Sequence, residues 1–157
     1  NGICEIANDN AEGQVIISGE KKSVEFFKNF LKEKKIKTIP LKVSAPFHCT
    51  LMKTAAKAME DKINETNFDI PRIEIINNVT ADSEKNPEII KKLLIEQIYS
   101  TVRWRESIIK MYNKGVKKFI EIGPGKALTG MVKRTVKDSI SFSINTLDDI
   151  KKLNDES

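Results

Sequence analysis

This sequence is poor in the residues that cross-link a fold or bind metals. Its 157 residues contain two cysteines, Cys4 and Cys49, and one histidine, His48. Two cysteines make no disulfide framework, so we expect free thiols in a reducing compartment. One histidine and two separated cysteines are too few ligands for a standard zinc site, and we therefore predict no bound metal.

Long apolar runs are missing as well. No stretch approaches the length of a membrane span, and residues 1–4 have neither the basic segment nor the apolar region of a secretory signal. We therefore predict a cytoplasmic protein that does not contact a membrane. The chain starts with Asn1 instead of Met, which leads us to expect a piece of a longer protein.

Charge of one sign is not concentrated anywhere. The net charge is +5, from 27 Lys and Arg against 22 Asp and Glu, and the lysines are scattered over most predicted helices. A nucleic-acid-binding protein typically gathers its surplus in one basic stripe with aromatic residues between, so we predict no nucleic-acid partner. Solvated lysine-rich faces explain most of the surplus, and an acidic protein or a phosphate-bearing ligand remains a possible partner.

Hydrophobic periodicity divides the chain into alternating strands and helices. It predicts strands at 4–7, 14–18, 36–43, 73–76, 119–122 and 140–144, the third at an edge or bulge because it contains Pro40. Helices are predicted at 22–34, after Pro46, from Pro87 with Asn86 as N-cap, at 102–114, and over 128–136. The last ten residues form either a short helix or a frayed end.

The order of these elements indicates an α/β fold. The later part alternates strands and helices, which is typical of a mostly parallel sheet with crossover helices. The earlier part has two consecutive strands, a helix and a strand, as in part of a small α+β unit. We place the boundary near Ser44, which gives predicted units at 1–44 and 45–157.

His48 lies in the stretch V-S-A-P-F-H-C-T-L-M, residues 43–52, at a predicted strand-to-helix junction. Open α/β folds place ligands at such carboxyl ends of strands, and a neutral histidine there can act as a base. A surface or capping histidine is the open alternative. Cys49 is a poor candidate nucleophile for His48, since neighbours in a helical turn point about 100° apart.

A histidine base would require a serine nucleophile, and these residues do not supply one. The nucleophile elbow G-x-S-x-G is absent, and Ser18 in I-S-G-E has the wrong flanks. A histidine-dependent enzyme would therefore need a serine from further sequence. The turn Gly123-Pro124-Gly125-Lys126 admits two interpretations, an anion-binding turn or a tight β-α turn that needs glycine.

Five motifs in order carry a family resemblance: A-N-D-N-A-E-G-Q-V-I-I-S-G, A-P-F-H-C-T-L-M, N-N-V, Q-I-Y-S-T-V-R-W and E-I-G-P-G-K-A-L-T-G. Together they make the chain similar to the malonyl-CoA:acyl carrier protein transacylase family over nearly its whole length. The resemblance implies the carboxyl-terminal half of that enzyme. The implied fold is the C-terminal part of an α/β-hydrolase-like core, plus part of a small ferredoxin-like subdomain.

The resemblance also implies an activity. The family moves a malonyl group from coenzyme A to a serine and then to the phosphopantetheine thiol of acyl carrier protein, in fatty acid synthesis. His48 matches the catalytic base, and Gln97 matches the position whose main-chain carbonyl orients it. The resemblance implies no metal or redox cofactor, coenzyme A thioester as substrate, and a monomer at full length.

Substrate-binding positions follow from the same resemblance. Phe47 matches the residue that shapes the acyl pocket in related polyketide synthase acyltransferases, where a bulky ring favours malonyl over a methyl-branched unit. The alternative is that Phe47 packs as a core aromatic. Asn8, Asn10 and Asn78 match polar positions facing the cleft, although asparagine also forms turns.

A group of basic residues is the candidate surface for the acidic carrier protein. It consists of Lys126, Lys133, Arg134 and Lys137. A solvated helix face is the alternative for each of them.

The implied enzyme is incomplete in this chain. The serine elbow, the arginine that pairs with the malonyl carboxylate and the oxyanion-hole donors would all belong to the half that is absent, so we expect these residues alone to be inactive. Two other interpretations stay open: an acyltransferase domain of a polyketide synthase, and a non-catalytic module that binds a phosphate-bearing ligand at the Gly123 turn.

Overall fold

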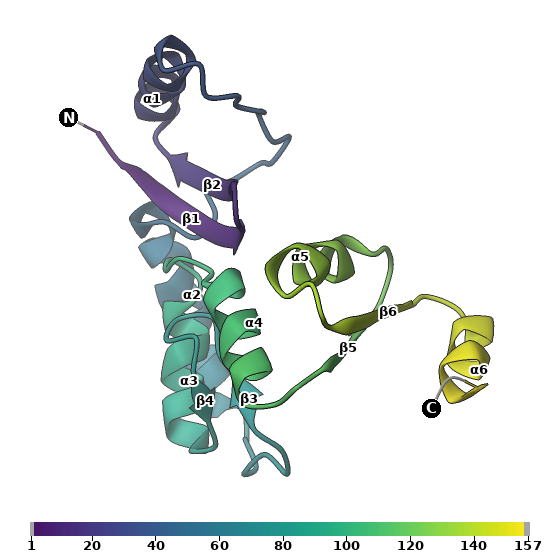
Figure 1. Ribbon diagram of the computed structural model, residues 1–157. Helices are drawn as coiled ribbons and strands as arrows, with labels where there is room; N and C mark the ends of the chain where they lie inside the picture. Colours follow the sequence, from purple (N-terminus) through teal and green to yellow (C-terminus); the bar gives the residue numbers. More distant parts are fainter. Residues whose placement is uncertain (1, 156–157) are drawn as a thin grey trace.

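The computed structural model describes residues 2–155, which form an elongated molecule with a side arm (Figure 1). A hairpin and one helix lie at one end, three helices extend to the other end, and the arm holds the last two strands and helices (Figure 1). The elements are β1 Cys4–Ala11, β2 Gln14–Gly19, α1 Lys21–Glu33, the short 3-10 helix η1 Thr50–Met52, α2 Lys53–Glu65, β3 Ile75–Ile76, β4 Ser83–Glu84, α3 Pro87–Glu96, α4 Trp104–Asn113, β5 Lys118–Ile122, α5 Ala127–Thr135, β6 Ile140–Ile144 and α6 Leu147–Asp155.

The N-terminal hairpin is longer than the sequence pattern predicts. β1 and β2 are antiparallel and turn at Glu12 and Gly13, where Gly13 has a φ of 71°. The predicted loop at 8–13 is wrong for its first four residues, because Asn8 pairs with Ile16 on one side and forms a parallel bridge with Val102 on the other. These ladder bonds outweigh the turn preference of Asn and Asp.

The predicted strand at 36–43 does not form. The segment is irregular, and Ile39, Leu41 and Val43 are all exposed. Pro40 lacks the N–H that a ladder needs, and no described strand lies against this segment to hold the alternating pattern in a sheet. Alternation alone therefore gave a false strand.

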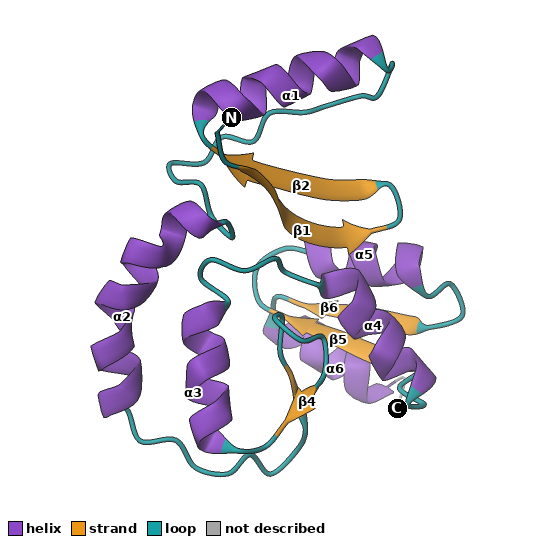
Figure 2. Cartoon of the chain, turned by 90° about the vertical axis from the view of Figure 1, so that its left-hand side faces the viewer, coloured by secondary structure: helices purple, strands orange, loops and turns teal. Residues whose placement is uncertain are grey.

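The three helices predicted for the central part of the sequence all form. α2 and α3 lie side by side (Figure 2). The predicted cap of α3 is confirmed: the Asn86 side-chain oxygen accepts from Glu88 N at 3.0 Å, and Pro87 occupies the first turn. α4 begins at Trp104 and not at 102, because Val102 pairs with β1.

The arm is a β-α-β unit built on a small apolar core. β5 and β6 are parallel, with Ile120 opposite Phe142, and α5 connects them. The strands predicted at 119–122 and 140–144 are confirmed within one residue, and the ten C-terminal residues are helical as far as Asp155. The core consists of Ile108, Val132 and Val136, with Trp104, Met111, Tyr112 and Phe119 packed against it.

The α/β class is confirmed, but the expected mostly parallel sheet is not found in residues 2–155. The strands there make three separate two-stranded sheets, of which only β5·β6 is parallel. A parallel pair requires a crossover, and α5 is the one helix that provides it; β1 and β2 are joined by a two-residue turn that enforces antiparallel pairing.

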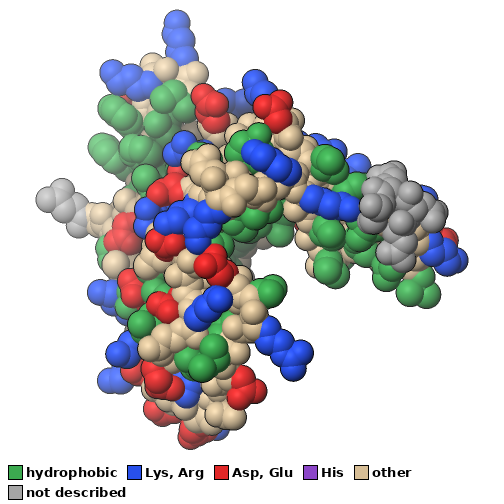
Figure 3. Space-filling model, turned by 60° about the horizontal axis from the view of Figure 1, so that its bottom comes forward, with side chains coloured by type: hydrophobic (Ala, Val, Ile, Leu, Met, Phe, Trp, Pro, Cys, Tyr) green, Lys and Arg blue, Asp and Glu red, His purple; other side chains and the backbone are tan. Residues whose placement is uncertain are grey.

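The boundary predicted near Ser44 stays a prediction. β1 is joined to the later part by the Val102 bridge and by a bidentate ion pair in which Arg105 contacts Asp9 at 2.7 Å. Across residues 2–155 we find no helix with the length and apolar character needed to span a bilayer. Figure 3 shows Lys and Arg side chains scattered over one face rather than gathered in a stripe.

Candidate active site

His48 lies in a tight turn and not in a helix. Its backbone has a left-handed φ of 57°, a conformation that residues with a Cβ atom disfavour. The helical segment begins two residues later, at Thr50. The predicted strand-to-helix junction is therefore wrong on both sides, since irregular chain precedes His48 and a turn contains it. The side chain is half-buried.

Cys49 is buried beneath this turn and is bonded to its main chain. It is fully buried at 0 % exposure, and its thiol donates to the Pro46 carbonyl oxygen at 3.1 Å. Neither Cys49 nor Cys4 forms a disulfide, which agrees with the free thiols expected from the sequence. A thiol without solvent access, bonded to the backbone of its own turn, holds that turn and does not reach a substrate.

The ring of His48 is oriented by a main-chain group of Gln97. Nδ1 of His48 lies 2.9 Å from the carbonyl oxygen of Gln97. A carbonyl oxygen only accepts hydrogen bonds, so Nδ1 carries a proton, and in the neutral form of the ring the lone pair is therefore on Nε2. A neutral imidazole in this tautomer can accept a proton at Nε2.

The Gln97 carbonyl is available because of its place at the end of α3. Gln97 is the C-cap, and its own N–H bonds back to Leu93 O at 2.9 Å. The last carbonyls of a helix have no intrahelical partner, and they form the negative end of the helix dipole. The same group that fixes the tautomer therefore also faces any positive charge that the ring gains.

Asn78 is hydrogen-bonded to the side chain of Gln97, whose main-chain carbonyl orients His48. Its side-chain nitrogen donates to Gln97 Oε1 at 3.3 Å, and its carbonyl accepts from Arg103 N at 3.2 Å. Arg103 also donates to Val79 O at 3.2 Å and forms an ion pair with Glu106, which holds the pKa of Glu106 below its ordinary value. Asn78 thus lies next to the His48–Gln97 pair.

Asn8 and Asn10 occupy β1, on either side of Asp9. Asn8 is half-buried and Asn10 is buried at 6 % exposure. Asp9 accepts three hydrogen bonds from Arg105, and Asp9 N donates to Val102 O at 2.9 Å. These bonds fix the strand positions of the two asparagines; neither one lies in a turn, so their turn-forming alternative is ruled out.

Phe47 lies directly before His48 and is 47 % exposed. The Phe47 ring is therefore not packed in the core formed by residues 2–155.

The candidate carrier-protein residues lie on and around α5. Lys126 is its N-cap, and Lys133 and Arg134 form its last turn, with Lys137 following; all four are exposed. Arg134 differs from the lysines because its guanidinium group donates to Gln14 Oε1 and thereby links α5 to β2.

The Gly123-Pro124-Gly125 turn is a tight β-α connection. Gly123 and Gly125 have φ values of 136° and 96°, which require glycine. The N–H groups at the start of α5 are already bonded to an anion, since the Glu121 carboxylate accepts from Leu128 N at 3.2 Å and Thr129 N at 2.7 Å. These bonds lower the pKa of Glu121. The anion-binding alternative for this turn is therefore disfavoured.

Several contacts around the site join residues that are far apart in the sequence. Glu5 and Thr50 are partners 45 residues apart, and Arg105 bonds Asp9 from 96 residues away, so hydrophobic periodicity within a segment cannot reveal these pairs. Within residues 2–155 no group of three or more His, Cys, Asp or Glu side chains is arranged to hold a metal ion.

Comparison with known families gives a match over nearly the whole chain. The model of the acyl transferase domain family matches residues 4–153. Malonyl CoA-acyl carrier protein transacylase of Bacillus subtilis is 45 % identical over 133 residues, covering 84 % of this chain and 42 % of the relative. The transacylase of Haemophilus influenzae is 40 % identical over 144 residues, covering 91 % of this chain and 46 % of the relative.

Solved structures agree with these relatives. An acyl carrier protein S-malonyltransferase from Vibrio cholerae superposes with a TM-score of 0.94 at 42 % identity, over 98 % of this chain and 50 % of that one. A malonyl-transacylase in complex with a type II polyketide synthase acyl carrier protein has a TM-score of 0.95 at 35 % identity, over 99 % and 51 %. The chain spans about half the length of the curated relatives it matches.

Proposed function

Because this chain belongs to the acyl transferase domain family, we propose that it carries the histidine half of the active site of a malonyl-CoA:acyl carrier protein transacylase. The named relatives support the substrate pair, since they are transacylases for malonyl-CoA and acyl carrier protein. We place the catalytic serine in the part of the full-length protein that these residues do not span.

The observation that carries this proposal is the 2.9 Å contact of His48 Nδ1 with the Gln97 carbonyl oxygen. It leaves Nε2 as a base. In the first half-reaction Nε2 takes the serine proton while the serine oxygen attacks the malonyl thioester carbon. When the carbon–sulfur bond breaks, the imidazolium returns that proton to the coenzyme A thiolate.

The second half-reaction repeats these steps with the phosphopantetheine thiol. Nε2 takes the thiol proton as the sulfur attacks the malonyl-serine ester, and the proton then goes back to the serine oxygen. Gln97 and the C-terminal end of α3 stabilise the imidazolium in both halves. No metal or redox cofactor takes part, and coenzyme A enters only as the thioester substrate.

The finer description of the fold is also a proposal. We assign β5, α5 and β6 to the C-terminal part of an α/β-hydrolase-like core, and β1, β2 and α1 to part of a ferredoxin-like subdomain that ends near Ser44. The parallel pairing of β5 with β6 and the antiparallel β1–β2 hairpin support these assignments.

Phe47, Asn8, Asn10 and Asn78 are our proposed substrate-binding residues. Phe47 adjoins the base and would limit the acyl group to an unbranched malonyl unit. Asn78, through Gln97, adjoins it as well. Lys126, Lys133 and Arg134 would attract the acidic carrier protein. We further propose a cytoplasmic monomer at full length.

Two alternatives rank lower. An acyltransferase domain of a polyketide synthase shares the same chemistry, and the named relatives favour the transacylase of fatty acid synthesis. A phosphate-binding module at the Gly123 turn is disfavoured because Glu121 already occupies the N–H groups at the start of α5.

Intact-mass analysis after incubation with malonyl-CoA tests the proposal. The full-length protein should gain one malonyl group, and addition of acyl carrier protein should remove it. The 157-residue chain alone should gain none. A stoichiometric adduct on this chain alone, or no adduct on the full-length protein, would overturn the assignment.

A further inference from the structure

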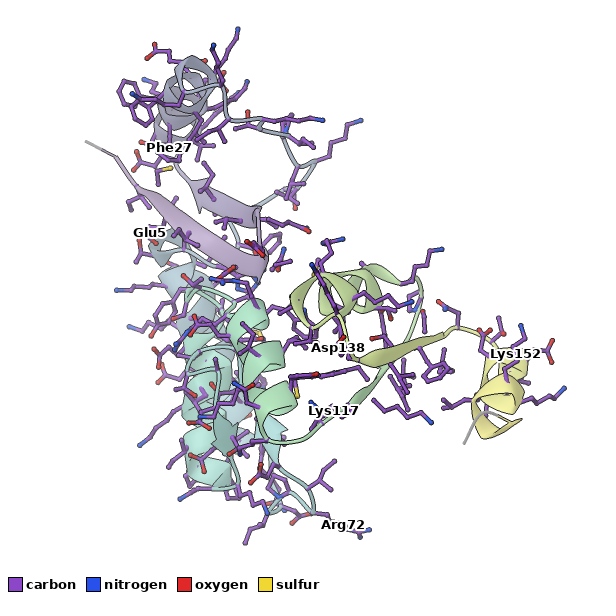
Figure 4. The ribbon with its side chains drawn as sticks, in the orientation of Figure 1. Glu5, Phe27, Arg72, Lys117, Asp138 and Lys152 are labelled. Atoms are coloured by element: carbon purple, nitrogen blue, oxygen red, sulfur yellow. The ribbon has the colours of Figure 1, made fainter. Side chains whose placement is uncertain are left out.

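The turn that contains His48 is tied to the first strand by one carboxylate. Glu5 on β1 accepts from Thr50 N at 2.8 Å with one oxygen and from the Thr50 hydroxyl at 2.7 Å with the other. In Figure 4, Glu5 lies on β1 beside the chain that leads into α2. The two residues are 45 positions apart in sequence, so this contact is purely tertiary.

Thr50 needs a partner at this point. It is the first residue of η1, which runs directly into α2, and the preceding Cys49 supplies no side-chain cap. The first N–H groups of a helical segment lack intrahelical acceptors and favour a negative charge nearby. Glu5 therefore caps this segment from another strand, and the two Thr50 bonds lower the pKa of Glu5, so it is ionised at neutral pH.

The turn requires such restraint because of its backbone. A left-handed φ at a residue with a Cβ atom persists only where surrounding contacts fix it. The His48 ring is held by Gln97 O, and Cys49 is held inside the turn by Pro46 O. The exit of the turn at Thr50 is held by Glu5.

We propose that Glu5 is a positioning residue for the His48 base: by anchoring both donors of Thr50, it holds the left-handed turn that aims Nε2 at the reacting atoms. This inference rests on the proposed function of His48. Glu5 touches neither substrate nor His48, and it acts through Thr50. Its removal releases the exit of the turn, leaves the Thr50 N–H without its acceptor and lets the ring move from its aligned position.

The primary test is kinetic, in the full-length protein. Glu5→Ala should lower kcat by about tenfold to a hundredfold, which is the scale of a displacement of about 1 Å in a catalytic group. KM for malonyl-CoA should stay within about twofold, because ground-state binding is untouched. Glu5→Gln keeps one acceptor oxygen and should give an intermediate kcat, as should Thr50→Val, which loses only the hydroxyl donor.

A matched control separates this effect from general loss of charge on β1 and its turn. Glu12 is an exposed acid at the turn of the same hairpin. Glu12→Ala should keep the parental kcat and KM. Equal losses of kcat in Glu12→Ala and Glu5→Ala would overturn the inference.

A double substitution separates positioning of His48 from structural damage. If Glu5 acts through His48, Glu5→Ala should change the residual rate of His48→Ala by less than about twofold. The same tenfold or larger loss in that background would show general damage and overturn the inference. Full activity in His48→Ala would instead overturn the proposed function. Loss in His48→Ala with none in Glu5→Ala would overturn this inference alone.

Discussion

Nδ1 of His48 lies 2.9 Å from the main-chain carbonyl oxygen of Gln97, although 49 residues separate them in the chain. The partner of the histidine is thus a backbone group at a helix end, whereas the histidine of a Ser-His-Asp triad is oriented by a carboxylate. A neutral acceptor is sufficient to fix the tautomer, and the helix end adds partial negative charge.

Because His48 contributes its side chain and Gln97 only its main-chain carbonyl, substitutions of the two residues should affect activity differently. His48→Ala in the full-length protein should reduce kcat/KM for malonyl transfer by at least about a hundredfold, which is the lower range for loss of a general base. Gln97→Ala keeps the carbonyl and loses only the Asn78 contact, so its activity should stay within about threefold of the parent. Steady-state transfer to acyl carrier protein measures both variants. A comparable collapse in Gln97→Ala would show that the side chain, and not the carbonyl, carries the role.

Phe47 should control acyl selectivity through its size. Phe47→Ser should raise the ratio of kcat/KM for methylmalonyl-CoA over malonyl-CoA by about tenfold, since one methyl group in an apolar pocket is discriminated on that scale. The measurement is competition between the two thioesters in the full-length protein. Phe26→Ser is the control, because Phe26 is an exposed aromatic on α1, 77 % accessible. An unchanged ratio in Phe47→Ser would remove Phe47 from the acyl pocket.

The lysines around α5 should act on carrier-protein affinity alone. Lys126→Glu and Lys133→Glu should each raise KM for acyl carrier protein by about fivefold at low salt and leave KM for malonyl-CoA unchanged. The effect should shrink as salt is raised, because exposed charges are screened. Arg134 is left out because it also bonds Gln14. Lys57→Glu on the exposed side of α2 is the control, and an equal rise there would mean that only net charge matters.

Glu121 should make the stability of the arm depend on pH. The Thr129 backbone bond, with the Thr129 hydroxyl and Leu128 N, lowers its pKa from the ordinary value of 4.5. The folded state therefore binds fewer protons, and the stabilisation is complete above the unfolded-state pKa and lost as pH falls through the folded-state pKa.

Glu121→Gln should accordingly flatten the acid side of the stability curve. The thermal midpoint of the parent should fall more steeply below about pH 4.5 than that of the variant, and the two should differ most near neutral pH, where only the parent has the charge. Glu60→Gln, an exposed position of α2, should keep the parental pH dependence. Parallel curves for parent and Glu121→Gln would contradict the capping role of Glu121.

The sequence was most reliable where a pattern is local. Asn86 before Pro87 marked the start of α3, and alternating apolar residues marked β5 and β6. These features depend on contacts within a few residues, so the chain encodes them directly. The false strand at 36–43 shows the limit, because alternation predicts a strand only where another strand is available to pair with it.

The sequence by itself determined the family, the single histidine, most of the helices and the strand–helix–strand order of β5, α5 and β6. Only the tertiary structure decided how His48 is held: the left-handed turn, the Gln97 carbonyl, and the Glu5 carboxylate at Thr50. The physical reason is distance along the chain. A main-chain carbonyl has no residue signature, and a carboxylate that caps a turn 45 residues later is indistinguishable in sequence from any solvated acid.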